Sequence, residues 1–129
     1  MKRFAAVATV LLVLLACAAT AASAADGLSG TFTTTIHGGG GLAGSWSIKF
    51  SHGKYRVIKN GRTVVRGKYT VSGPKLNMKD TSGVLACKPT GRYRYSLSGR
   101  TLKFRNTGDR SIGCLGRATV LSHVFTKAK

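Results

Sequence analysis

The chain of 129 residues contains no glutamate, and its only acidic residues are Asp26, Asp80 and Asp109. Against these three stand 21 lysines and arginines, which give a formal net charge of +18. Most of the cationic side chains therefore have no carboxylate to pair with inside the chain, and we expect them to face water. A charge of this size attracts nucleic acid, anionic polysaccharide, wall polymers or acidic lipid. The alternative is that the charge serves only to keep the protein soluble.

The same shortage leaves poor material for catalysis, because general acid–base chemistry needs two titratable groups held in suitable positions. The three histidines, His37, His52 and His123, are scattered and lack the spacing of metal ligands. No serine lies in a Gly-x-Ser-x-Gly motif, and the glycine run 38–41 lacks the Lys-Ser/Thr ending of a phosphate-binding loop. We therefore expect a protein that is not an enzyme, with no catalytic residue, metal or cofactor.

The aspartates have simpler interpretations than catalysis. Asp80 stands where a strand is expected to end, which is typical of a turn residue. Asp109 lies close to Arg110 and Arg117, which favours an ion pair in a loop.

Long apolar runs are missing except at the N-terminus. Lys2 and Arg3 precede an apolar run over Phe4–Leu15, which is shorter than the roughly 20 residues that span a bilayer. Ala22-Ser23-Ala24 is typical of a signal-peptidase site. The sequence predicts a cleaved signal peptide over 1–24 and one domain over 25–129, exported to the medium, the periplasm or the cell surface. Without Lys2 and Arg3 the charge would be about +16.

The signal segment holds an alternative. Leu14-Leu15-Ala16-Cys17 resembles a bacterial lipobox, in which Cys17 would become the lipidated first residue and 18–25 would serve as a tether. The sequence does not decide between lipidation at Cys17 and cleavage after Ala24.

Only Cys87 and Cys114 remain after the signal segment. In an exported protein such a pair predicts a disulfide. The bridge would close a loop of about 27 residues and contribute about 3–4 kcal/mol in the chain-entropy model.

Signals for helices are almost absent after the signal segment, whereas apolar and polar residues alternate between short turns. The sharpest turn signal is Asn60-Gly61, because a type I′ hairpin needs positive φ at both central residues. The pattern predicts eight strands, over 30–37, 44–51, 54–59, 62–71, 75–80, 92–97, 101–106 and 118–126.

Alternation places apolar and cationic side chains on opposite faces of these strands. Consecutive hairpins of this kind predict an all-β fold, an eight-stranded antiparallel up-and-down barrel whose closure removes the edge strands. We expect the inner face to hold Phe32, Ile36, Trp46, Ile48, Phe50, Tyr55, Val57, Val65, Tyr69, Val71, Leu76, Met78, Tyr93, Tyr95, Leu97, Leu102, Phe104, Leu121 and Phe125. The outer face should hold Lys49, Lys54, Arg56, Arg66, Lys68, Lys75, Lys79, Arg92, Arg94, Lys103 and Arg105.

At this level the chain resembles the lipocalin-like domains of the calycin superfamily, and in particular small exported bacterial proteins. The resemblance is carried by Gly30-Thr31-Phe32, Trp46-Ser47-Ile48-Lys49-Phe50, Asn60-Gly61, Gly67-Lys68-Tyr69-Thr70-Val71, Leu76, Asp80, Gly91-Arg92-Tyr93, Asp109 and Cys114-x-x-Arg117. Phe32 stands where the family usually has tryptophan, and Arg117 could take the place of the arginine that caps the closed end. The resemblance implies a barrel with an apolar cavity, but it does not name the ligand.

Two binding hypotheses follow, both for a monomer without sequence-specific recognition of nucleic acid. The first is an interior pocket for a small apolar ligand, and its candidate residues, which would otherwise form a packed core, are Trp46, Phe50, Tyr69, Tyr93, Tyr95 and Phe104. The second is contact of the exterior with an anionic polymer, membrane or protein, in an inhibitory or adhesive role. Its candidate residues are Arg56, Arg66, Lys68, Arg92, Arg94, Lys103 and Arg105.

Overall fold

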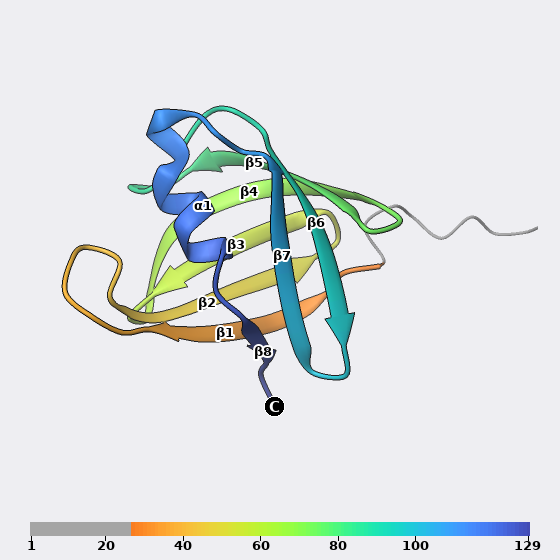
Figure 1. Cartoon of the computed structure of the whole chain (residues 1–129), viewed down its shortest axis with the longest axis horizontal. Helices are drawn as coiled ribbons and strands as arrows, with labels where there is room; N and C mark the ends of the chain where they lie inside the picture. The colour runs from red at the N-terminus through yellow and green to blue at the C-terminus, as the bar shows by residue number, and fades with distance from the viewer. Residues whose placement is uncertain (1–26) are drawn as a thin grey trace, which may run out of the picture.

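Side-chain alternation runs through seven consecutive segments, and each forms a strand in the computed structural model, which describes residues 27–129. The chain then passes through a short 3₁₀ turn and a helix before a last strand (Figure 1). The elements are β1 (Gly30–Ile36), β2 (Gly44–Ser51), β3 (Lys54–Lys59), β4 (Arg62–Ser72), β5 (Lys75–Ser82), β6 (Gly91–Ser98), β7 (Thr101–Gly108), η1 (Ile112–Cys114), α1 (Leu115–Leu121) and β8 (Phe125–Lys127).

Every strand pairs antiparallel with the next, and β8 closes the sheet between β7 and β1. The closing pairs are Leu102 with Phe125 on one side and Phe32 with Lys127 on the other. The predicted eight-stranded up-and-down barrel is therefore confirmed.

Two hairpin turns follow from their sequence chemistry. Asn60 and Gly61 have φ values of 49° and 81°, and His52 and Gly53 have 50° and 76°. Positive φ at both central residues is the requirement of a type I′ turn, whose twist matches that of the flanking strands. These turns fix the registers of β2 with β3 and of β3 with β4.

The core is formed by the predicted inner face with few changes. Of that set, Val57, Tyr95 and Phe104 are only partly buried, although they pack against the core. Leu97 was placed on the inner face wrongly, since 40% of its surface is exposed. Pairing of β5 with β6 ends at Arg94, so Leu97 extends past the barrel wall. Leu28, Val64 and Val120 complete the core.

The predicted strand over 118–126 is wrong in its first part. Residues up to Leu121 belong to α1, and only Phe125–Lys127 form β8. Arg117, Val120 and Leu121 have the i, i+3, i+4 spacing that brings side chains to one face of a helix, and all three line the barrel interior. Val120 and Leu121 are adjacent in sequence and both face the interior. A helix allows this, whereas a strand would point them to opposite faces.

The predicted signal peptide over 1–24, its cleavage after Ala24 and lipidation at Cys17 lie outside the described residues. Within 27–129, no helix is long and apolar enough to cross a membrane.

The predicted disulfide joins Cys87, in the β5–β6 connection, to Cys114 at the end of η1. Their Cα atoms are 5.3 Å apart and both residues are buried. The bridge therefore ties the two longest connections of the C-terminal half to each other.

Replacing both cysteines with serine is expected to lower the free energy of unfolding by about 3 kcal/mol, because the unfolded chain loses a closed loop. Thermal unfolding of the oxidised protein, the reduced protein and the double variant measures the effect, with a decrease in Tm of more than about 10 °C expected. Equal Tm values with and without reductant would contradict a structural role for the bridge.

Candidate functional site

A cavity of about 310 Å³ lies inside the barrel beneath α1. Its strand-borne wall is mainly apolar and includes Trp46, Ile48, Val57, Val65 and Met78. The remaining wall comes from the β5–β6 connection and from the inner face of α1, which contributes Arg117, Val120 and Leu121. Its volume is at the lower end of the range of small-molecule sites.

Exposed apolar side chains surround this cavity on two connections. Val84 and Leu85 line the cavity and are 85% and 47% exposed. Ile112 and Leu115, next to the lining residue Gly113 and to Gly116, are 87% and 57% exposed. The Cys87–Cys114 disulfide joins these connections, so a covalent bond holds the two exposed apolar segments together beside the cavity.

The polar part of the wall belongs to a chain of five buried side chains, Tyr55, Asp80, Arg117, Asp109 and Tyr93, called here the polar chain. At its centre, Arg117 donates from Nε to Asp109 Oδ2 at 2.7 Å and from Nη2 to Asp109 Oδ1 at 2.8 Å. The Tyr93 hydroxyl donates to Asp109 Oδ2. The predicted ion pair of Asp109 is therefore confirmed with Arg117, in a buried and bidentate form.

The other half of the polar chain is built around Asp80. Its Oδ1 accepts a hydrogen bond from the Tyr55 hydroxyl and lies 3.5 Å from Arg117 Nη1. Its Oδ2 accepts from the backbone N–H of Cys87 at 2.9 Å. The interpretation of Asp80 as a turn residue is wrong, since it lies within β5 and only 7% of its surface is exposed. Its carboxylate instead holds the β5–β6 connection from the inside, through the N–H of Cys87.

One atom of the polar chain is incompletely satisfied. Arg117 Nη1 is buried, and no described residue accepts a hydrogen bond from it. The side chain of Arg117 is only 8% exposed. Nη1 forms an ion pair with Asp80 Oδ1 at 3.5 Å but no hydrogen bond, and Arg117 is among the residues that line the cavity.

The network controls the protonation of its members. Burial opposes the charged form of Asp109, but hydrogen bonds from Arg117 and Tyr93 and the charge of Arg117 together lower its pKa. Burial likewise opposes the charge on Arg117, yet Asp109 and Asp80 raise its pKa. Burial and the neighbouring carboxylates raise the pKa values of Tyr55 and Tyr93, so both tyrosines stay protonated donors.

Two glycines make room for the polar chain. A β-carbon at Gly91 would lie 2.7 Å from Asp109 Oδ2 and 2.8 Å from Arg117 Nη2. A β-carbon at Gly67 would overlap the ring of Tyr55. The ion pair and the tyrosine therefore occupy space that any other residue would fill.

The predicted pocket residues separate into two groups. Trp46 lines the cavity, and its Nε1 donates to the Leu42 carbonyl at 2.8 Å. The rings of Phe50 and Tyr69 pack edge-on with centroids 5.1 Å apart, and Phe104 packs against Tyr93 and Phe125. Tyr95 is half-buried with its hydroxyl 3.3 Å from the Gly27 carbonyl. Of the six, only Trp46 is among the cavity-lining residues.

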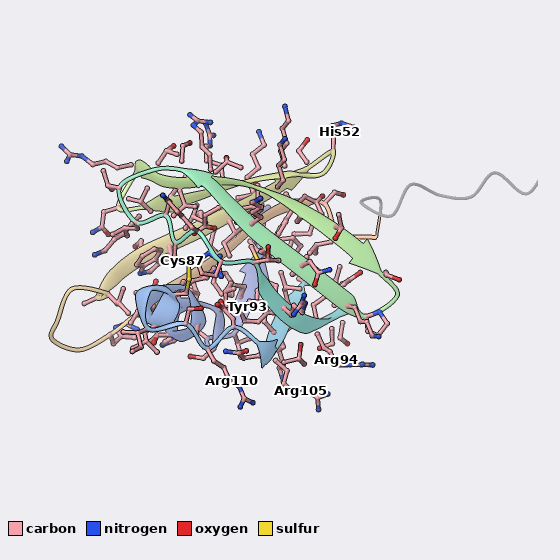
Figure 2. The ribbon with its side chains drawn as sticks, turned by 90° about the horizontal axis from the view of Figure 1, so that it is seen from above. His52, Cys87, Tyr93, Arg94, Arg105 and Arg110 are labelled. Carbon is pink, nitrogen blue, oxygen red and sulfur yellow. A yellow bond between two sulfur atoms is a disulfide. The ribbon has the colours of Figure 1, made fainter. Side chains whose placement is uncertain are left out.

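The predicted basic residues lie in two places on the exterior. Arg56 pairs across the sheet with Arg66, and Lys68 follows on β4. Arg94 pairs with Arg105, while Arg92 and Lys103 lie on the same two strands, β6 and β7. Figure 2 shows Arg94 and Arg105 pointing away from the barrel on the side opposite His52.

Sequence reasoning missed Tyr55, Asp80 and the segment 84–87 as parts of the cavity wall. A signal was present for Asp80, since an aspartate that interrupts the apolar positions of a strand needs a buried partner. The partner of Asp80 is Arg117, and the sequence could not identify it because the helix that carries Arg117 was not predicted. Segment 84–87 carries no periodicity that would have located it.

Replacing Tyr93 with Phe is expected to lower the free energy of unfolding by about 1–3 kcal/mol at neutral pH, because Asp109 loses a donor. The pKa of Asp109 is lowered by folding, so its contribution is present above the ordinary carboxyl pKa and is lost as the pH falls through the folded value. The difference between wild type and variant should therefore shrink below about pH 4. Urea unfolding between pH 2.5 and 7.5 measures it.

Tyr95→Phe on the same strand is the matched control, since the Tyr95 hydroxyl makes only a long contact with a backbone carbonyl. It should change stability by less than about 0.5 kcal/mol at every pH. A Tyr93→Phe difference that stays constant with pH would show that the hydroxyl does not act through Asp109.

Comparison of the chain with protein-family models, with curated proteins and with solved structures finds no match. The resemblance to lipocalin-like domains thus stays a prediction from the residues that carry it.

Proposed function

We propose that this protein binds a small, mainly apolar molecule in the cavity beneath α1. The observation that carries the proposal is the combination of an apolar wall with Arg117, whose buried Nη1 lies 3.5 Å from Asp80 Oδ1 and makes no hydrogen bond to a described residue. Such sites are typically lined by apolar side chains, with a few polar groups that orient the ligand. Both carboxylates among the described residues are held by Arg117 and a tyrosine, which supports binding rather than catalysis.

The polar chain also suggests the head group of the ligand. Asp80 and Asp109 carry two negative charges against the one positive charge of Arg117, so the polar chain that reaches the wall through Asp80 and Arg117 is net negative. A second anion beside it would be repelled, whereas a neutral oxygen could accept a hydrogen bond from Nη1 without adding charge. We therefore expect an apolar body with one neutral acceptor, such as a hydroxyl or a carbonyl.

The volume sets the length of the ligand. About 310 Å³ corresponds to roughly ten water-sized volumes, which is enough for a molecule of about ten non-hydrogen atoms. Burying eight methylenes contributes at most about 6 kcal/mol at about 0.8 kcal/mol each. The dissociation constant of a simple ligand such as 1-octanol should then be no tighter than tens of micromolar.

The disulfide supports a place of action outside the cytoplasm, since such bonds persist in oxidising compartments. Export remains part of the proposal, and an apolar molecule in the medium or the cell envelope would be the natural ligand.

The single tryptophan of the chain lines the cavity and is a built-in reporter. Titration with 1-octanol should change Trp46 fluorescence saturably. Val57→Phe, which adds volume to the cavity wall on β3, should weaken binding at least tenfold. Ile58→Phe, on the next residue and outside the lining, should bind as wild type. Each variant is first compared with wild type by thermal unfolding. No saturable signal in the folded wild type, or equal affinities of the two variants, would overturn the proposal.

The head-group expectation is tested with three probes of equal length. At pH 7.5, 1-octanol is expected to bind at least about tenfold more tightly than octanoate, because the carboxylate meets a wall of net negative charge. Octylamine serves as the cationic comparison. Tighter binding of octanoate would show instead that Arg117 dominates the local field and that the ligand is an anion.

A further inference from the structure

The outer face of β2, β3, β4 and β5 carries a groove of about 700 Å³ that has no part in the proposed ligand cavity beyond the shared ring of Tyr55. Five cationic side chains line it, Lys49, Lys54, Arg56, Arg66 and Lys68, together with His52. We call it the cationic groove. The rest of its lining is mainly small and polar and includes Ser51, Thr81 and Ser82.

The hollow has a local cause in the sheet. The register between β4 and β5 shifts after Arg66. Arg66 pairs with Ser82 and the next residue, Gly67, pairs with Asp80, so Thr81 is skipped in the pairing. A bulge of this kind bends and twists the strand that contains it. Gly67, which has no side chain, lies at the same point.

Sheet register places like charges directly opposite each other in this groove. Lys49 pairs with Arg56, and Arg56 pairs with Arg66, across three neighbouring strands. Lys54 pairs with Lys68 in the adjacent row, and Lys79, outside the groove lining, continues that row on β5. Neighbouring strands lie about 4.8 Å apart, and like charges directly opposite destabilise a sheet.

No acid offsets this charge within residues 27–129. The two aspartates of this region are buried in the polar chain, and their ion pairs go to Arg117. In addition, Arg56 Nε is buried, and no described residue accepts a hydrogen bond from it. The groove therefore holds a grid of donors whose repulsion a bound anion would relieve.

From these observations we propose that the cationic groove binds a linear phosphodiester chain through its charged backbone. The opposed cations form rows that run across β2, β3 and β4, and a linear polymer with regularly repeated charges can follow such a row. Lysine and arginine offer only donors, which match the acceptor oxygens of phosphate. Tyr55, the one tyrosine, phenylalanine or tryptophan in the lining, is buried and engaged with Asp80, so it offers no ring for base stacking. Recognition is therefore of the charge on the phosphodiester backbone.

The test measures binding of a fluorescent 12-residue thymidine oligonucleotide and of an abasic phosphodiester of equal length by anisotropy at several salt concentrations. The two should bind equally, with a slope of log K against log salt near −3.5 if about five phosphates are contacted. Stronger binding of the oligonucleotide than of the abasic chain would overturn recognition of the backbone alone. Heparin or vesicles of anionic lipid that bind more tightly than both chains would overturn the assignment to phosphodiesters.

The chain supplies a matched pair of variants. Arg56→Gln with Arg66→Gln removes a directly opposed pair in the groove, and Arg94→Gln with Arg105→Gln removes such a pair from β6 and β7. Both double variants lose the same net charge. The groove variant should bind at least tenfold more weakly, with a slope smaller in magnitude by about 1.4, while the control should stay within about twofold.

Stability provides a second readout that separates loss of the site from loss of the fold. Because the removed arginines repel each other, the groove variant should melt at the same or a higher temperature than wild type at low salt. Equal losses of binding in the two double variants would show that overall charge, not the groove, attracts the polymer. Failure of octanol to bind the cavity would leave this result unaffected.

Discussion

The bidentate ion pair between Arg117 and Asp109 is the interaction on which the rest of this structure depends. It joins α1 to the end of β7, and through Tyr93 and Asp80 it extends to β6 and β5. Breaking a buried pair by removing one partner typically costs about 3–5 kcal/mol, because a charge is left uncompensated. The position of α1, and with it the ceiling of the cavity, therefore depends on one guanidinium together with the disulfide at Cys114 and the buried Val120 and Leu121.

This arrangement also explains the contrast between the inside and the outside of the barrel. The described residues have two carboxylates, and both are used to hold Arg117. Within residues 27–129 the salt bridges involve Arg117 alone, and sheet register brings several of the other cations into opposed pairs. A molecule with so few acids can use them inside or on its surface, and this one uses both described aspartates inside.

Much of the barrel could be predicted because its physics is local. Alternation places a residue such as Ile48 inside and Lys49 outside without reference to the rest of the chain, and Asn60-Gly61 specifies its own turn. What failed depended on distant partners. The segment that contains Val120 and Leu121 forms a helix because Arg117 must reach Asp109 in the interior. The cavity wall could not be predicted either, because its location depends on where α1 and the β5–β6 connection cover the barrel.

Closure of the barrel by β8 has a consequence for the timing of folding. The three-residue strand β8 pairs with both β7 and β1, and Lys127 meets Phe32 across almost the whole described chain. Contacts of such large sequence separation slow folding, because the loop must close before the contact forms. A nascent chain that ends before Phe125 has two open strand edges and no ring. Only a chain that already includes Phe125–Lys127 can close the ring, so closure follows the formation of the seven hairpin-linked strands before it.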